Sequence, residues 1–358
     1  MRRIANIYHH SRTPSLQSRS RFIPAVQFPG AISYSTRARP PIFPSSSSIS
    51  VTRSPLPCRS TPLPHPPPPP TARIMATTAD AVALIESSKK AAAYQAVEDY
   101  LLPSHKYVGI GSGSTVVYVV EAIKAKGPAF YGGMTFIPTG SQSKGLITLA
   151  GFRMNNLDER PVVDGKAVAL DVAFDGADEV DEELNLIKGG GACLFQEKLV
   201  AAAAKQFIAV ADSRKQSARL CTKWKAIPIE VLPMAAPDVL NKLKDMGSTG
   251  PAVRSGLPSK AGECVSDNGM WIIDAPFPSL LLPKDLKDGQ DGSGKDGVWE
   301  INKLAETLIK LPGIVEIGLF YGFNGDEAVK TRQVLPAQKP IAAYFGLPTG
   351  EVQVQKAA

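Results

Sequence analysis

The sequence predicts an α/β protein: a parallel sheet covered by helices on both faces, joined to a smaller α+β domain. Two observations predict this class. Short apolar segments alternate with helical patterns from residue 79 to residue 211, as expected for strands joined by crossover helices. After Lys215 the pattern changes, because Pro228, Pro233 and Pro237 interrupt the chain and strand signals alternate with short helices.

Hydrophobic periodicity predicts the elements of the larger domain. Apolar residues at helical spacing predict a first helix over 79–102. The later elements are strands at 107–111, 135–138, 168–174 and 207–211, and helices at 116–124, 142–150 and 197–205. Because strands and helices alternate, we expect a Rossmann-like arrangement.

The smaller domain is predicted from turn signals and short apolar segments. Asp267-Asn268-Gly269 predicts a tight hairpin turn. The expected elements are strands at 227–231, 270–274 and 315–320 and a helix at 301–310, with polar excursions at 284–297 and 324–340. We therefore expect a Rossmann-like catalytic domain over 75–222, completed by 319–358, and a smaller α+β domain over 223–318.

Residues 1–74 differ in composition from the rest of the chain. They contain ten Arg and no Lys, Asp or Glu, and they include an unbroken proline run at 66–70. Such a segment cannot bury enough apolar surface to fold, so we expect a disordered extension. An Arg-rich, Ser-rich and acid-free segment also fits a mitochondrial transit peptide. We expect the folded protein to begin near Met75, which favours a cytoplasmic location and leaves a mitochondrial one as the alternative.

Charge and apolar runs exclude two classes of partner. The net charge is +7, but without the ten arginines of the extension the remainder is near −3. A nucleic-acid partner is not expected, because it needs a basic patch on the folded part. No apolar run reaches the roughly 18 residues that a membrane span needs, so no membrane partner is expected either.

Cysteine and histidine are too sparse for metal or histidine chemistry. The four cysteines are far apart, at Cys58, Cys193, Cys221 and Cys264. Metal ligation and a disulfide framework are therefore not expected. His105 is the one histidine after residue 74, which weakens any mechanism based on histidine.

The segment Gly109–Thr115 lies where a predicted strand leads into a helix. Backbone N–H groups at such a turn bind anions, and Ser112, Ser114 and Thr115 add hydroxyl donors. A dinucleotide site is disfavoured, because Ser114 stands where the third glycine of the nucleotide fingerprint is needed. A single phosphate is favoured, and a plain tight turn is the alternative.

Two acids follow the predicted strand 168–174 directly. Asp175 and Asp178 are separated by Gly176 and Ala177, which leave open space beside them. Because ligands bind at the carboxyl ends of parallel strands, we expect both acids to face a pocket. The next acids are expected to be solvated surface charges: Glu179, Asp181, Glu182 and Glu183.

A triple glycine and a helical acid complete the predicted site. Gly189, Gly190 and Gly191 are costly in backbone entropy, which suggests a close approach to a ligand or amides that face an oxyanion. Lys188 adds a positive charge beside them. Glu197 lies in the first turns of the next helix, where a partly desolvated carboxylate can act as a general base. Lys215 follows another strand end and is a further candidate.

These motifs resemble, in order and spacing, those of the type A ribose-5-phosphate isomerase family in its eukaryotic form. The resemblance covers about 86–354, and residues 187–198 (IKGGGACLFQEK) are its most specific part. It implies that Glu197 shuttles the proton, with Asp175, Asp178 and Lys188 at the reacting end of the sugar. The substrate-binding residues are then expected to be Lys89, Ser112, Gly113, Ser114, Thr115, Gly176, Ala177, Gly189, Gly190, Gly191 and Lys215.

The implied activity interconverts D-ribose 5-phosphate and D-ribulose 5-phosphate through a cis-enediolate, in the non-oxidative pentose phosphate pathway. The resemblance also implies no cofactor, no metal, and a homodimer or homotetramer. An amino-sugar-phosphate deaminase of the same fold and a non-catalytic sugar-phosphate sensor are the alternatives. The sequence departs from the family pattern at two points. Ser112 stands where many members have Thr, and the loops at 283–298 and 324–340 are longer than in compact members.

Overall fold

The computed structural model describes residues 78–331 and 338–357. The predicted disordered extension over 1–74 lies outside the described residues. The predicted domain boundaries, at 222/223 and 318/319, stay a prediction.

The larger sheet has six strands. Its spatial order is β2 (Thr135–Pro138), β1 (Tyr107–Ile110), β5 (Leu170–Asp175), β8 (Ala204–Asp212), β14 (Ala342–Gly346) and β15 (Val352–Lys356). All neighbouring strands are parallel except β14 and β15, which are antiparallel. The mostly parallel α/β sheet predicted from the alternating pattern is confirmed.

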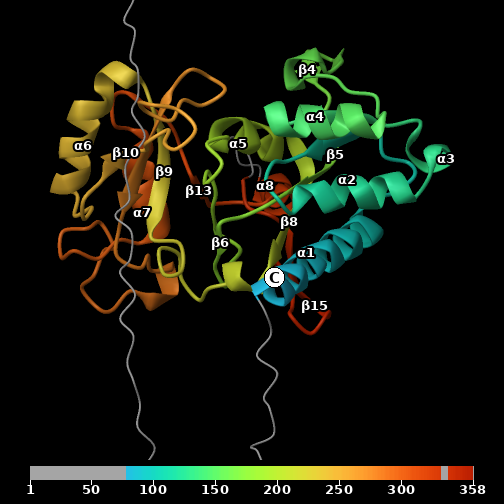
Figure 1. Cartoon of the computed structure of the whole chain (residues 1–358). Helices are drawn as coiled ribbons and strands as arrows, with labels where there is room; N and C mark the ends of the chain where they lie inside the picture. Colours follow the sequence, from blue (N-terminus) through green and yellow to red (C-terminus); the bar gives the residue numbers. More distant parts are fainter. Residues whose placement is uncertain (1–77, 332–337, 358) are drawn as a thin grey trace, which may run out of the picture. The chain divides into compact units, whose positions relative to one another are not determined.

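Helices cover this sheet on both faces. They are α1 (Thr78–Tyr100), α2 (Val116–Ala125), the short α3 (Pro128–Tyr131), α4 (Ser141–Ala150) and α5 (Leu194–Ala203). In Figure 1, α1, α2 and α4 lie together on one side of the molecule. Neighbouring residues along β5 point to opposite faces, so Phe174 joins the core under α1 and α2 while Ala173 joins the core beside α5. Burial of both faces explains why these strands read as unbroken apolar runs.

The second sheet is antiparallel and has four strands. Its order is β10 (Ala252–Val253), β11 (Trp271–Pro276), β9 (Ala226–Val231) and β12 (Ile314–Ile317). Residues of α6 (Ala236–Asp245) and α7 (Ile301–Ile309) share one apolar core with this sheet. Figure 1 shows α6 and α7 beside β9 and β10, and we call this part the small lobe.

The remaining elements are shorter. A three-stranded sheet contains β6 (Glu179–Val180), β7 (Leu186–Ile187) and β13 (Leu319–Phe320), and β3 (Val162–Val163) pairs with β4 (Lys166–Ala167). The remaining helical segments are α8 (Gly325–Thr331) and four 3₁₀ turns, at Leu157–Glu159, Ser213–Lys215, Pro233–Ala235 and Pro283–Asp285. Part of the predicted excursion at 324–340 is therefore helical, and 332–337 lie outside the described residues.

The predicted elements agree with the structure within a few residues, with one real difference. The strand predicted over 315–320 is divided into β12 and β13 at Gly318. A Cβ atom at Gly318 would lie 2.3 Å from the carbonyl oxygen of Lys188 and 2.8 Å from that of Pro228. The chain breaks the strand here because the two sheets approach each other closely at this glycine.

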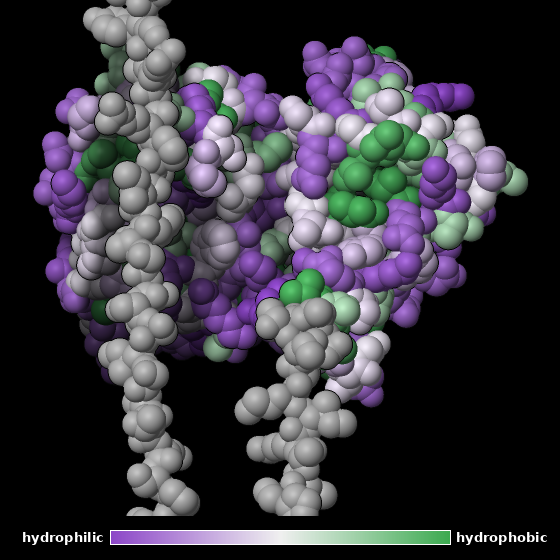
Figure 2. Space-filling view, viewed as in Figure 1, coloured by the Kyte–Doolittle hydropathy of each residue, from purple (hydrophilic) through white to green (hydrophobic). Residues whose placement is uncertain are grey.

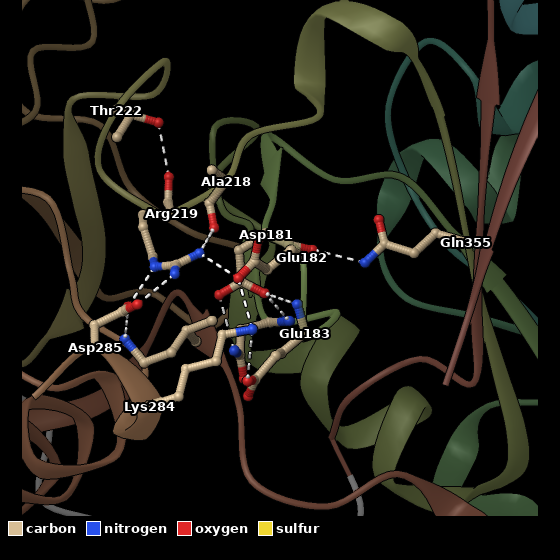
Figure 3. A network of polar contacts seen from close by, with 11 residues as sticks. Asp181, Glu182, Glu183, Ala218, Arg219, Thr222, Lys284, Asp285 and Gln355 are labelled. Atoms are coloured by element: carbon tan, nitrogen blue, oxygen red, sulfur yellow. Dashed lines mark hydrogen bonds and ion pairs between the residues drawn. The ribbon is translucent and has the colours of Figure 1, made fainter. Parts of the chain in front are cut away.

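The expectation of solvated acids after Asp178 is wrong for two of the four. Glu179 is fully buried and Asp181 is 1% exposed. Asp181 accepts hydrogen bonds from Asn185, and burial raises its pKa to about 6. Glu182 remains at the surface, where it forms ion pairs with Arg219 and with Lys284 (Figure 3).

The surface is mainly hydrophilic in the view of Figure 2, with a green apolar area over the part that holds α2 and α4. Val117 of α2 and Leu149 of α4 are among the exposed apolar side chains. Within 78–331 and 338–357, none of the helices has both the length and the apolar character to span a bilayer.

Candidate active site

A cavity of about 380 Å³ lies at the carboxyl ends of the parallel strands. The segments that follow β1, β2, β5 and β8 all contribute to its wall, because carboxyl ends of parallel strands meet at one edge of a sheet. The segment between β7 and α5 contributes the triple glycine. The small lobe adds Asp267, from the hairpin turn before β11.

The structure brings the sequence-predicted site residues together. All of them line this cavity except Asp175, which lies behind the wall and contacts Lys188. The wall residues among them are Lys89, Ser112, Gly113, Ser114, Thr115, Gly176, Ala177, Asp178, Lys188, Gly189, Gly190, Gly191, Glu197 and Lys215. Their chemical roles stay predictions.

Three charged side chains form a buried cluster at one end of the cavity. The Lys188 Nζ atom lies 3.0 Å from Asp175 Oδ2 and 3.2 Å from Glu197 Oε2, and it donates to the carbonyl oxygen of Gly176 at 2.6 Å. All three side chains are at most 6% exposed. We call Asp175, Lys188 and Glu197 the charged triad.

The two oxygens of Glu197 have different surroundings. Oε1 accepts a hydrogen bond from the Ser112 hydroxyl. Oε2 is buried and has no hydrogen-bond partner; its contact with Lys188 has the distance of an ion pair but not the geometry of a hydrogen bond. One oxygen is thus fixed by the loop before α2, and the other has free lone pairs.

The triad contains two carboxylates and one ammonium group, and burial and these charges together shift the pKa values of Asp175 and Lys188. Burial raises the pKa of Asp175 to about 7, and the charge of Glu197 acts in the same direction. Burial alone would lower the pKa of Lys188, but attraction by Asp175 and Glu197 outweighs burial and raises it. Lys188 therefore stays charged at neutral pH.

Close contacts require glycines in this wall and directly behind it. A Cβ atom at Gly111 would lie 2.0 Å from Asp175 Oδ1. Gly189 has a φ of +107°, and a Cβ atom at Gly190 would lie 2.8 Å from Asp178 Oδ1. The Gly190 amide donates to Asp178 at 2.7 Å, so the triple glycine lets this carboxylate lie against the backbone.

The part of the cavity wall formed by α1 and the loop before α2 is rich in hydrogen-bond donors. Lys89 lies in α1, and its Nζ atom donates to the Ser114 hydroxyl at 3.0 Å. Glu86 holds Lys89 at 2.7 Å, and Glu86 in turn accepts a hydrogen bond from Tyr118 at 2.8 Å. The loop before α2 and this lysine thus form a donor-rich surface of the kind that binds phosphate.

Sequence reasoning missed several wall residues. They are Gly140, Ser141, Gln142, Ala192, Cys193, Ala211, Asp212, Arg214 and Asp267. Arg214 is adjacent to Lys215 and could have been found from the same strand end. For Asp267 the sequence showed only a hairpin turn, and no signal placed that turn against the other sheet.

The arrangement suits proton transfer next to an anchored anion. A carboxylate lies beside a lysine that stays charged, and hydroxyl and amide donors line the same cavity. In the described part of the chain no histidine lines the cavity: His105 lies after α1, where its Nδ1 atom accepts from the Leu102 amide.

Comparisons with known proteins agree with this geometry. A family model described as ribose 5-phosphate isomerase A (phosphoriboisomerase A) matches residues 135–333. A ribose-5-phosphate isomerase of Mycosarcoma maydis is 42% identical over 275 residues, which cover 76% of this chain and 82% of that protein. The corresponding protein of Schizosaccharomyces pombe is 44% identical, with 76% and 85% covered.

Solved structures give the same result. A structure of D-ribose-5-phosphate isomerase in complex with phospho-erythronic acid is 30% identical, with a TM-score of 0.59 over 76% of this chain and 99% of that one. Ribose 5-phosphate isomerase A of Methanocaldococcus jannaschii is 28% identical, with a TM-score of 0.58 and with 76% and 99% covered. The chain with the buried lysine and carboxylates at its sheet edge belongs to the ribose 5-phosphate isomerase A family.

Proposed function

We propose that this chain interconverts D-ribose 5-phosphate and D-ribulose 5-phosphate through a cis-enediolate, with Glu197 as the base. The observation that carries the proposal is the Glu197 carboxylate: it is buried in the cavity wall, with one oxygen fixed by Ser112 and the other unbonded beside Lys188. A base must be positioned and must also keep a free lone pair.

In the proposed reaction, Glu197 removes the proton from C2 of the open-chain aldose. The electron pair forms the C1–C2 double bond, and negative charge develops on O1. A proton moves from O2 to O1, and Glu197 returns its proton to C1, which leaves the ketone at C2. One carboxylate serves both carbons because the enediolate is cis.

Lys188 and the amides of the triple glycine are the proposed donors to the developing oxyanion. Asp178 lies against the Gly190 amide, where it can accept a hydrogen bond from a sugar hydroxyl. Asp175 lies behind Lys188, so its proposed role is to orient that ammonium group. A direct proton transfer by Asp175 is not part of the proposal.

The phosphate is proposed to bind at the donor-rich end. The loop Ser112–Thr115 precedes α2, and Lys89 and Lys215 bring positive charge to the same cavity, whereas Arg214 is paired with Asp212. Helix N-termini and cations act together in binding phosphate. The anchored phosphate would hold C1 and C2 near Glu197 and reduce the entropic cost of reaching the reactive geometry.

The proposal is tested by incubating the full chain with ribose 5-phosphate in deuterium oxide and following the sugar by NMR. Ketose with deuterium at C1, and recovered aldose with deuterium at C2, are expected, because the carboxylate exchanges its proton with solvent. Tight binding without ketose would favour the sugar-phosphate sensor, and ammonia release from an amino-sugar phosphate would favour the deaminase. Neither alternative is supported by the comparisons.

The expectations about cofactors, assembly and location are retained as proposals. A chelator is expected to leave turnover unchanged, since no metal is part of the proposed mechanism. The expected homodimer or homotetramer would be measured by analytical ultracentrifugation. A cytoplasmic location would be tested by imaging a tagged full chain, with mitochondrial import as the contrary result.

A further inference from the structure

Two helices begin at the cavity, and their N-termini differ in what lies against them. Helix α2 starts after the loop that ends at Thr115, and helix α4 starts at Ser141. Both ends carry the partial positive charge of a helix N-terminus, so each attracts an anion. At the start of α2 the nearby groups are hydroxyls and the Lys89 ammonium group.

The start of α4 already holds an anion of the chain itself. The Oδ2 atom of Asp267 accepts hydrogen bonds from the Ser141 amide at 3.0 Å and from the Ser141 hydroxyl at 2.9 Å. Asp267 comes from the small lobe, 126 residues away along the sequence. Its exposed side chain lines the cavity. The positive end of α4 is thus neutralised by the carboxylate of Asp267.

Buried contacts fix the turn that carries Asp267. The neighbouring Asn268 donates to Glu230 Oε1 at 2.9 Å, and Ser266 donates to the same oxygen at 2.7 Å. Glu230 is fully buried in β9. Asn268 also accepts from Gln196, the residue before Glu197, at 2.9 Å. The turn is held from both sides, so the Asp267 backbone has a fixed position next to the start of α4.

Asp267 lies close to the reacting end of the cavity. A Cβ atom at Gly140 would lie 2.6 Å from Cys193 Sγ and 3.1 Å from Asp267 Oδ2, so these three residues meet. Cys193 is one helical turn before Glu197. Burial raises the pKa of Cys193 to about 12, and the charges of Glu197, Asp175 and Asp267 act in the same direction. A group attached to C1 would therefore meet negative charge here.

We propose that Asp267 is a specificity-determining residue: its carboxylate occupies the second helix N-terminus of the cavity and rejects sugars that carry a second anionic group at C1. A pentose 5-phosphate presents one anion, which the donors near α2 accept. A pentose 1,5-bisphosphate would bring a second anion toward Asp267, where like charges repel. The inference rests on the proposed isomerase function, because that function determines that C1 of the bound sugar lies at the end of the cavity near Asp267.

The test compares Asp267→Asn with the unchanged full chain. The asparagine oxygen still accepts from Ser141, but the negative charge is removed. The measured quantity is a ratio: the inhibition constant of ribulose 1,5-bisphosphate divided by the KM of ribose 5-phosphate. This ratio is expected to fall by about tenfold or more in Asp267→Asn, and to stay near its original value in Asp267→Glu, which keeps the charge.

Asp238→Asn is the matched control, because Asp238 is an exposed acid in the first turn of α6 and does not line the cavity. It is expected to leave the ratio unchanged. An unchanged ratio in Asp267→Asn, or an equal fall in Asp267→Glu, would overturn the inference.

Binding of ribose 5-phosphate and ribulose 1,5-bisphosphate, measured by calorimetry, separates a failure of this inference from a failure of the proposed function. If the chain bound both sugars but did not turn over ribose 5-phosphate, the isomerase proposal would fail. The affinity ratio in Asp267→Asn would still decide whether Asp267 selects by charge.

Discussion

Two buried acids of the segment 175–183, Glu179 and Asp175, differ in the partners of their carboxylates. Glu179 accepts, through one oxygen, from Ser217, from the amide and hydroxyl of Thr222, and from the Lys223 amide. Asp175 accepts from the Ser112 and Gly176 amides, and it also shares the cation Lys188 with Glu197. The first acid is held by neutral donors that brace a loop, whereas the second belongs to a cluster with more negative than positive charge.

The difference shows how neighbouring acids acquire different roles. Donors supplied by a nearby loop make a buried acid part of the framework, as also at Asp181 in Figure 3, which accepts hydrogen bonds from Asn185. In the charged triad, Glu197 lines the cavity beside Lys188 and its carboxylate is available for chemistry, whereas Glu179 does not line the cavity. Three variants test this distinction, ordered from the largest expected effect to the smallest.

Lys188→Met is expected to have the largest effect, because it leaves two buried carboxylates without their cation. The unfolding free energy should fall by about 3–5 kcal/mol, as for other broken buried ion pairs. The kcat of the remaining folded protein should fall by roughly 10²–10³ through loss of the oxyanion donor. Urea unfolding and steady-state kinetics measure the two effects.

Lys205→Met is the control for this variant, since Lys205 pairs with Asp171 but is 63% exposed. It should cost less than about 1 kcal/mol. If both variants lost the same unfolding free energy, burial would not explain the contribution of the triad to stability.

Glu179→Ala is expected to lower stability with little effect on chemistry. It leaves the donors of Ser217, Thr222 and Lys223 without their shared acceptor, which costs about 1–3 kcal/mol. The kcat of the folded protein should stay within about threefold, because Glu179 does not line the cavity. A large fall in kcat with an unchanged melting temperature would show instead that Glu179 takes part in the reaction.

Asp175→Asn should act mainly on the pH dependence of stability, and at neutral pH its effect should be the smallest of the three, because the contribution of the Asp175 proton is largely lost there. The pKa of Asp175 is raised by burial to about 7 in the folded chain and is near 3.8 without that burial. The folded state therefore binds its proton more tightly, and this contribution to stability is complete below pH 4 and lost as the pH rises to about 7.

The stability of the unchanged chain relative to Asp175→Asn should thus decline between pH 4 and pH 7 and level off above. Melting temperatures of both proteins across this range measure the difference. A relative stability that rises with pH would show that Asp175 titrates below its usual range.

Local sequence patterns predicted most of the larger sheet and most of the cavity wall. The strands were visible because burial on both faces makes them continuous apolar runs, and the triple glycine at 189–191 signalled a close approach. The break at Gly318 and the burial of Glu179 could not be predicted in this way. Both depend on contacts with segments far along the chain: Lys188 and Pro228 for Gly318, and residues 217–223 for Glu179.

The same reason explains why Asp267 was missed. Its turn was predicted correctly, and Val265 pairs with Trp271 across it. Its function in the cavity depends on the contact with Ser141, and local periodicity contains no information about the docking of one lobe on the other.

The central claim is that the Glu197 carboxylate moves the proton, and Glu197→Gln tests it most directly. The kcat for ribose 5-phosphate should fall by roughly 10²–10⁴, because the amide cannot act as a base although it keeps an oxygen for Ser112. The dissociation constant of ribose 5-phosphate, measured by calorimetry on the same variant, should change only slightly. Turnover close to that of the unchanged chain would contradict the account and remove Glu197 from the reaction.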